Sequence, residues 1–228
     1  MGHLGREKPH YSVVTDKRFL PQSFGEHGES FWTSGEKEAE VAQRMRQRHD
    51  RRDASSLTCV EYGCGVGRVT MALARRFARV IAYDISPAHL VLARDRSASV
   101  QVDNVHFVDG GNSVVADLAR CDFFYSRIVF QHNPPPLIAV LVDAALRALK
   151  PRGIAIFQLP VYAHGYGFDL EKWLAHEAAL DMEMHVLPQE HVFARVATAG
   201  CELLEVREDN ATGAPQRYIS DTFVVRHP

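Results

Sequence analysis

The chain has 228 residues, of which 46% are hydrophobic, 24% charged and 9% aromatic, a composition typical of globular proteins and not of disordered or fibrous chains. Its 26 lysines and arginines nearly balance its 28 aspartates and glutamates, which disfavours a protein that binds nucleic acid along the phosphate backbone. We therefore expect a single domain with decorations and no nucleic-acid partner.

Cysteines, histidines and apolar runs exclude further classes. The four cysteines form no CxxC pair and the twelve histidines no HExxH spacing, so we predict neither a disulfide framework nor a metal site. The first residues lack the apolar core of a signal peptide, and no apolar run is as long as a membrane span. We expect a cytoplasmic protein; the sequence leaves the oligomeric state open.

Residues 1–50 are expected to form an N-terminal lid segment and a helix. Thr33 and Glu36 form a capping box, which predicts that the helix begins there. Acidic residues gather in its first turns and arginines toward its end, as the helix dipole favours. We interpret this charge pattern as a solvated helix.

From residue 57 onward, short apolar runs alternate with helical stretches, the pattern of βαβ units around a parallel sheet. Five runs are predicted strands, at residues 57–62, 80–83, 105–108, 123–125 and 154–157. Predicted helices cover residues 69–77, 136–149 and 189–199 and a stretch beginning at Pro87. Runs at 203–206 and 223–225 are separated by turn residues, so we expect them to pair antiparallel.

This order predicts an α/β fold, a Rossmann-like doubly wound sheet of seven strands with the last strand antiparallel. Residues 51–228 form the main domain, and residues 161–190 interrupt the alternation as a cap insertion over the strand ends. Its aromatic residues favour either an acceptor-binding wall or a small core of the cap itself.

The strongest motif is the segment EYGCGVGR, residues 61–68, where a buried strand enters a glycine loop and then a helix. Glycines allow a sharp turn and a close approach to a ligand. Asp84 and Asp109 end the next two strands, where a carboxylate can accept hydrogen bonds from a ribose diol or face an adenine amino group. Arg68 replaces the third glycine of the dinucleotide motif, which disfavours NAD.

With the later motifs AYDIS, VDGG, DFFYSRIVFQH and LKPRG, this segment resembles the class I S-adenosylmethionine-dependent methyltransferases. The resemblance implies that S-adenosyl-L-methionine is the cofactor and that Glu61 and the glycine loop hold its methionine end. The residues that it implies for cofactor binding are Trp32, Glu61, Gly63, Cys64, Gly65, Gly67, Arg68, Asp84, Ile85, Asp109, Gly110, Tyr125, Ser126 and Arg127. Trp32 belongs to a segment similar to a closing lid, although a hydrophobic staple would explain it equally well.

The methyl acceptor is less defined. The segment from Asn133 to Pro136 is similar to an amine-methylation motif but lacks its aromatic residue, and we interpret Asn133 as a helix cap. Methylation of a hydroxyl needs a base, for which His132, His164 and His185 are candidates. We predict O-methylation of a small molecule or sugar unit. An N-methyltransferase acting on protein or RNA, and a non-catalytic cofactor-binding subunit, are the alternatives.

Overall fold

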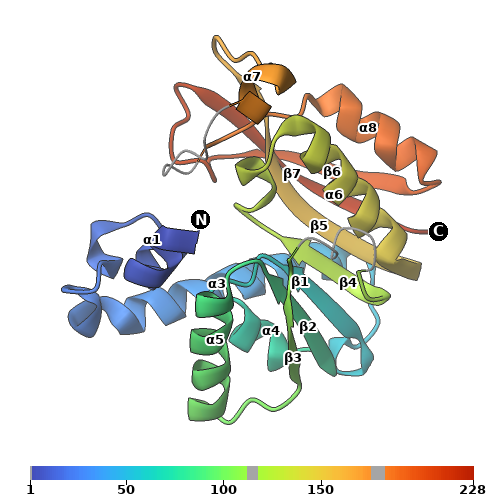
Figure 1. The fold of residues 1–228 in the computed structure, drawn as a ribbon. Helices are drawn as coiled ribbons and strands as arrows, with labels where there is room; N and C mark the ends of the chain where they lie inside the picture. Colours follow the sequence, from blue (N-terminus) through green and yellow to red (C-terminus); the bar gives the residue numbers. More distant parts are fainter. Residues whose placement is uncertain (1, 112–117, 176–182) are drawn as a thin grey trace.

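A computed structural model describes residues 2–111, 118–175 and 183–228 (Figure 1). Its single sheet has the strand order β3-β2-β1-β4-β5-β7-β6. The strands are β1 (Thr58–Tyr62), β2 (Arg79–Asp84), β3 (Val105–Asp109), β4 (Cys121–Ser126), β5 (Leu149–Ala163), β6 (Glu202–Asp209) and β7 (Tyr218–Arg226). Strands β1 to β5 are parallel, and β7 runs antiparallel to both β5 and β6. The predicted Rossmann-like sheet with an antiparallel last strand is confirmed.

Helices cover both faces of the sheet (Figure 1). Their bounds are α1 (Gly2–Glu7), α2 (Pro9–Val13), α3 (Phe24–His49), α4 (Thr70–Ala74), α5 (Pro87–Ser99), α6 (Pro135–Ala148), α7 (Leu170–Ala175) and α8 (Gln189–Thr198). Short 3-10 turns lie at Lys17–Phe19, Ala54–Ser56 and Phe130–His132. Helices α3, α4 and α5 share one hydrophobic cluster with the sheet, and α6 and α8 share the other.

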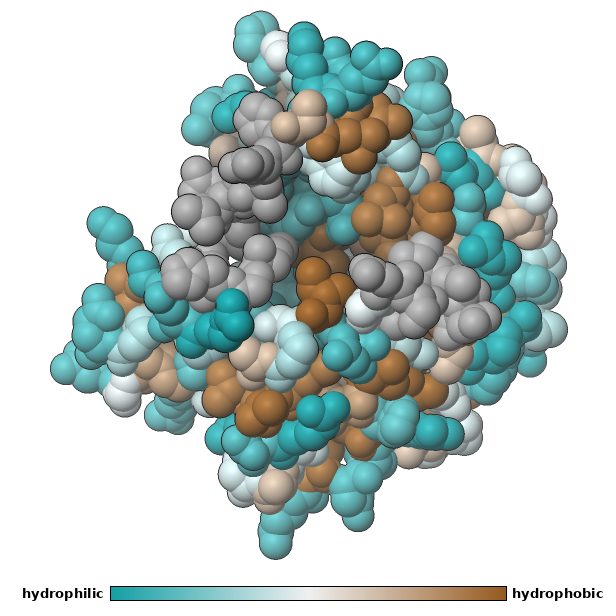
Figure 2. Space-filling view, in the orientation of Figure 1, coloured by the Kyte–Doolittle hydropathy of each residue, from teal (hydrophilic) through white to brown (hydrophobic). Residues whose placement is uncertain are grey.

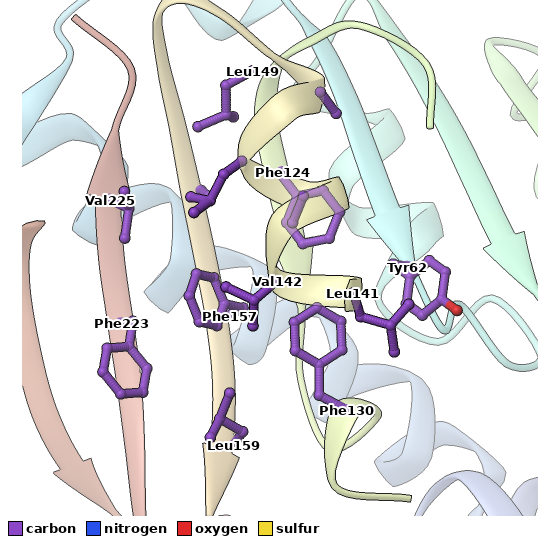
Figure 3. Packing of buried hydrophobic residues seen from close by; sticks show 14 of the residues in the cluster. Tyr62, Phe124, Phe130, Leu141, Val142, Leu149, Phe157, Leu159, Phe223 and Val225 are labelled. Atoms are coloured by element: carbon purple, nitrogen blue, oxygen red, sulfur yellow. The ribbon is translucent and has the colours of Figure 1, made fainter. Parts of the chain in front are cut away.

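The alternation of side chains along each strand separates these two clusters. Phe123 of β4 faces α3 and α4, whereas its neighbour Phe124 faces α6. On the α6 side, Phe157 stacks on Phe223 with ring centroids 5.4 Å apart, so the core crosses from β5 to β7 (Figure 3). The central strands β1, β4 and β5 are buried on both faces and mostly apolar, which is why they could be predicted from the sequence.

Helix α3 differs from its prediction, because it begins at Phe24 and not near Thr33. Thr33 and Glu36 therefore lie inside the helix and do not cap it. Glycines made the preceding residues look irregular, yet Gly35 is needed: a Cβ there would lie 2.0 Å from the carbonyl oxygen of Arg68. The close contact brings α3 against the start of the segment that leads into α4.

Other boundaries also differ. The helix predicted over residues 69–77 is shorter, since α4 ends at Ala74. Asn133 does not cap α6; its side-chain amide donates to the carbonyls of Val129 and Phe130, at 3.2 Å each, and so closes the preceding 3-10 turn. Strand β5 continues beyond the predicted run as far as Ala163, because β7 pairs with it along that length.

The predicted cap region, residues 161–190, is partly described, and residues 176–182 lie outside the described part. Residues 184–187 return to the body of the protein, where the Leu187 amide donates to the Pro160 carbonyl at 3.1 Å. Tyr166 and Met184 pack against a small cluster of Ala163, Val186 and Tyr218. Within the residues described, none of the helices combines the length and apolarity needed to cross a membrane.

Candidate active site

A cavity of about 470 Å³ lies where the carboxyl ends of β1, β2 and β4 meet the N-terminal segment. Figure 2 shows a hollow near the centre of the face presented in Figure 1. The cavity is lined by Ser12, Val13, Val14, Thr15, Glu38, Glu61, Tyr62, Gly63, Cys64, Gly65, Arg68, Val69, Asp84, Ile85, Ser86, His89, Gly110, Tyr125, Arg127, Ile128, Val129, Gln131, His132, Asn133, Met184, Ala211, Thr212 and Gly213. The fold thus gathers segments from nearly the whole chain around one space.

The glycine loop has the conformation that its sequence predicts. Gly63 and Gly65 have φ angles of 83° and 55°, in the left-handed region that glycine tolerates best. A Cβ on Gly63 would come within 2.2 Å of Val129, and one on Gly65 within 2.6 Å of Val13. The loop backbone therefore lies open to the cavity while neighbouring segments approach it closely.

Glu61, the acid that precedes this loop, is buried at the end of β1. The Thr70 hydroxyl donates to its Oε2 at 2.6 Å. Burial raises the pKa of Glu61 to about 8, and the nearby carboxylates Glu38 and Asp84 act in the same direction, against the effects of Thr70 and Arg68. Glu61 is thus a mostly neutral acid at pH 7 that an arriving cation would ionise.

Asp84 ends β2 and lines the same cavity. Its Oδ2 accepts from the Gly65 amide at 2.7 Å and its Oδ1 from the Ser86 amide at 2.8 Å. His89 Nδ1 lies 3.5 Å from Oδ1. The carboxylate is therefore fixed between the glycine loop and the start of α5, with both oxygens held in place.

The third predicted acid behaves differently. Asp109 is exposed and accepts from the Gly111 amide at 3.1 Å, and it is not among the cavity-lining residues. Its neighbour Gly110 lines the cavity, and the Gly110 amide donates to the Asp84 carbonyl at 2.7 Å. Ile85, which is 55% exposed, also lines the cavity.

A partly buried ion-pair group, which the sequence did not reveal, links α3 to the cavity. The Glu38 carboxylate accepts from Arg68 at 2.7 Å and from the Tyr125 hydroxyl at 2.9 Å, and it lies 3.4 Å from Arg127. Although burial alone would raise the pKa of Glu38, the two arginines and Tyr125 hold it below its ordinary value. Two guanidinium groups share one carboxylate, so this corner of the cavity suits an anionic group.

Besides Asp109, three further predicted cofactor residues lie outside the cavity lining. Trp32 packs edge-on against Phe31, with Arg96 4.2 Å above its ring, as a residue of a hydrophobic cluster would. Ser126 is buried and donates to the Tyr62 carbonyl at 2.9 Å. A Cβ on Gly67 would lie 2.8 Å from Met71, so this glycine serves the packing of the loop.

The three candidate bases are separated by the structure. His132 lines the cavity, and its Nδ1 lies 2.9 Å from the carbonyl oxygen of Glu183. His164 is exposed and outside the lining. His185 is also outside the lining, with its ring nitrogens 3.0 Å from the Tyr166 hydroxyl and 3.1 Å from Glu183 Oε2. Among the three, His132 is the one placed to meet a ligand.

The loop that leads to His132 contains a left-handed residue that is not glycine. Ile128 has a φ of 58°, a strained conformation for a β-branched side chain. Its amide donates at 2.9 Å to Oε1 of Gln158, which is fully buried and also bonds Ser220 at 2.5 Å. Gln158 therefore fixes the loop after β4, which no sequence motif had indicated.

The seven-stranded sheet with an antiparallel β7, and a cavity at the carboxyl ends of its parallel strands, agree with the resemblance to the class I S-adenosylmethionine-dependent methyltransferases. Residues 59–153 match the family model described as a methyltransferase domain, which supports the resemblance to the class I methyltransferases. Among the described residues, 2–111, 118–175 and 183–228, no group of three or more His, Cys, Asp or Glu residues is arranged to hold a metal ion.

Comparisons with individual proteins extend this match. The trans-aconitate 2-methyltransferase of Azoarcus sp. (strain BH72) is 32% identical over 105 residues, which cover 45% of this chain and 39% of that protein. The ubiquinone biosynthesis O-methyltransferase of Xylella fastidiosa (strain 9a5c) is 32% identical over 102 residues, which cover 43% and 40%. The match thus spans about two fifths of the length of these curated relatives.

One solved structure matches along the whole chain. Magnesium protoporphyrin IX methyltransferase from Synechocystis PCC 6803, with bound S-adenosylhomocysteine, superposes with a TM-score of 0.67 at 14% identity. The match covers 100% of this chain and 97% of that one. At this identity the likeness establishes the shared fold.

Proposed function

We propose that the chain binds S-adenosyl-L-methionine in the cavity and transfers its methyl group to a hydroxyl of a small molecule or sugar unit. The observation that carries the proposal is that Glu61, Asp84 and the glycine loop between them line one cavity. Asp84 is placed to accept hydrogen bonds from a ribose diol. The raised pKa of Glu61 suits a site that receives the cofactor's ammonium group, because the cation stabilises the carboxylate.

Two arginines fit the other end of the methionine moiety. Arg68 and Arg127 share the Glu38 carboxylate and line the cavity, so together they offer a net positive corner for the cofactor's carboxylate. The cofactor, when bound, supplies a methyl group activated by its sulfonium. The protein's main task is then to align the acceptor with that carbon.

His132 is the proposed general base. Because its Nδ1 meets the Glu183 carbonyl, Nδ1 carries the proton and Nε2 is left to accept one from an acceptor hydroxyl. Burial lowers the pKa of His132, which keeps the imidazole neutral near pH 7. The acceptor would lie among Ile128–Asn133, Met184 and the β6–β7 turn, a mostly uncharged lining. One of the relatives is an O-methyltransferase of ubiquinone biosynthesis, which agrees with a hydroxyl acceptor.

The test begins with calorimetry of S-adenosylhomocysteine. Asp84→Asn removes a charged acceptor of the ribose hydroxyls, so the affinity should fall about tenfold to hundredfold, equivalent to roughly 1.5 to 3 kcal/mol. Asp95→Asn on the exposed face of α5 is the matched control and should bind like the wild type. An unchanged affinity in Asp84→Asn would contradict the ribose role.

The acceptor class is tested by transfer of a labelled methyl group to panels of hydroxy acids, phenols, sugars, peptides and RNA. Product with a hydroxyl compound is expected. Product with peptides or RNA only would contradict O-methylation and would indicate an N-methyltransferase. Tight cofactor binding without any product would favour a non-catalytic subunit.

A further inference from the structure

We propose that His89 is a positioning residue that, through Ser12, fastens the N-terminal segment, residues 2–15, over the cofactor site. The inference rests on the proposed function, because it assigns the cofactor's ribose to Asp84. It adds two residues, Ser12 and His89, that no motif of the sequence indicated.

The geometry is a chain of three side chains. Ser12 Oγ lies 2.9 Å from His89 Nε2, and His89 Nδ1 lies 3.5 Å from Asp84 Oδ1. His89 is buried, with 6% of its surface exposed, and all three residues line the cavity. A single buried imidazole thus lies between the N-terminal segment and the carboxylate at the end of β2.

The direction of the bonds shows that this is a tether and not the serine nucleophile of a hydrolase. The Ser12 hydroxyl donates its one proton to the Pro9 carbonyl, at 2.7 Å. Its oxygen is therefore left to accept, so His89 Nε2 must be the donor between them. A base that would remove a proton from Ser12 needs the opposite arrangement.

The rest of the segment is shaped to lie close to the site. Residues 12–15 form one wall of the cavity. Val13 touches the glycine loop so closely that a Cβ on Gly65 would come within 2.6 Å of it. Gly5 lies over His89, since a Cβ there would be 3.0 Å from the ring nitrogen Nε2. Hydrophobic contacts thus hold the segment against the glycine loop. The hydrogen bond between Ser12 and His89 fixes the position of the segment relative to Asp84.

The proposal has a kinetic consequence. Because residues 12–15 form a wall of the site, a bound cofactor would leave faster when the segment is released. Loss of one hydrogen bond of ordinary strength corresponds to a change of about twofold to tenfold in an equilibrium constant. Dissociation should be affected more than association, as is usual for changes to a closed site.

Three variants separate the two contacts of the imidazole. Ser12→Ala removes the tether and leaves His89 beside Asp84. In His89→Gln the side-chain amide nitrogen takes the approximate place of Nε2 and can still donate to Ser12, whereas in His89→Asn it takes the place of Nδ1 and faces Asp84 alone. Ser30→Ala is the matched control, because the Ser30 hydroxyl also donates to the carbonyl three residues earlier, at 2.7 Å, on the exposed side of α3.

The measurements are the affinity and dissociation rate of S-adenosylhomocysteine, and hydrogen exchange of the residue 2–15 amides. For Ser12→Ala and His89→Asn we expect dissociation about fivefold faster and increased exchange in residues 2–15, with the melting temperature nearly unchanged. His89→Gln should restore protection of the segment, and Ser30→Ala should match the wild type.

The failures are distinguishable. If wild-type protein does not bind S-adenosylhomocysteine, the proposed function itself fails. If the wild type binds and Ser12→Ala leaves both dissociation and exchange within twofold of it, the tether is overturned. Should the His89 variants not fold, Ser12→Ala decides alone, because its only loss is an oxygen at the surface of the cavity.

Discussion

The two sides of the cavity achieve the same backbone conformation by different means. On the cofactor side, formed by Glu61, the glycine loop and Asp84, the left-handed residues are glycines. On the acceptor side, residues 128–133, the left-handed residue is Ile128, held by the buried amide of Gln158. The glycines of the cofactor side are recognisable as a short sequence motif. The conformation of Ile128 instead depends on Gln158, thirty residues further along the chain.

The two sides also differ in charge. Carboxylates and guanidinium groups surround the cofactor side, which suits one fixed zwitterionic ligand. Around the acceptor side the lining is mostly uncharged, with His132 as its proposed reactive group. We infer that the cofactor side is constrained by one ligand and that the acceptor side is free to differ between members of the fold.

The largest expected effect comes from Gly63→Ala. The new Cβ would meet Val129 at 2.2 Å in a left-handed conformation, which together cost roughly 2 to 5 kcal/mol. Binding of S-adenosylhomocysteine, measured by calorimetry, should fall at least hundredfold. Gly25→Ala, where a Cβ meets nothing within 4 Å, is the control and should bind normally.

A double variant sharpens this prediction. Val129→Ala removes the methyl groups that the new Cβ would touch, so Gly63→Ala/Val129→Ala should recover part of the affinity while the backbone strain remains. No recovery would mean that the left-handed conformation, and not the contact between the two sides, decides binding.

Next comes His132→Asn, which keeps an N–H group for the Glu183 carbonyl but removes the base. Turnover should fall about hundredfold or more at unchanged cofactor affinity. His164→Asn, at an exposed histidine outside the cavity lining, is the control for the substitution. Equal turnover in His132→Asn and the wild type would mean that alignment of the acceptor suffices.

Glu61→Gln tests the buried acid of the cofactor side, with an expected effect of about tenfold. Wild-type affinity for S-adenosylhomocysteine should rise with pH toward 8, because ammonium binding must displace the proton of Glu61, whereas the variant should bind weakly without this rise. The folded-state pKa of about 8 lies above the ordinary value of 4.5, so the wild type loses stability as pH rises from 4.5 through 8.

The same variant therefore has a second readout. Glutamine cannot ionise, so only the wild type should lose stability as Glu61 deprotonates. The melting temperature of Glu61→Gln should therefore rise relative to that of the wild type between pH 5 and pH 8. A constant difference across this range would contradict the raised pKa.

The smallest effect on turnover is expected from Gln158→Met, which removes the acceptor of the Ile128 amide and a partner of Ser220. The loop after β4 should lose its fixed position, so turnover should fall about fivefold and the melting temperature should drop, while cofactor affinity stays within twofold. Gln47→Met, on the exposed face of α3, is the control. A loss of cofactor affinity as large as the loss of turnover would show that the two sides are not separable.

Much of the fold was predictable because its determinants are local. Apolar strands buried on both faces, the glycine loop and the proline at the start of α5 each act within a few residues. The start of α3 was not predictable in the same way. Its glycines look like a loop, and the need for Gly35 arises only when the Arg68 carbonyl packs against it.

The same distinction holds in the site. Glu61 and Asp84 could be predicted to line the site because they lie at the ends of strands, whereas Glu38 lies in an acidic run that resembles any solvated helix. Its partners Arg68 and Arg127 belong to different βα units, so only the assembled sheet brings the three together. Ser12 and His89 were missed for the same reason.

The ion pairs of Glu38 also limit how far the chain can be truncated from its N-terminus. Ala39, Ala42 and Met45 of α3 are buried against the sheet, and the same helix carries the carboxylate that pairs with two guanidinium groups. A fragment starting at residue 51 would lack α3, so the apolar surface that α3 covers would be exposed. Arg68 and Arg127 would also lose the carboxylate that lies between them. The smallest portion of the chain worth expressing by itself therefore includes α3.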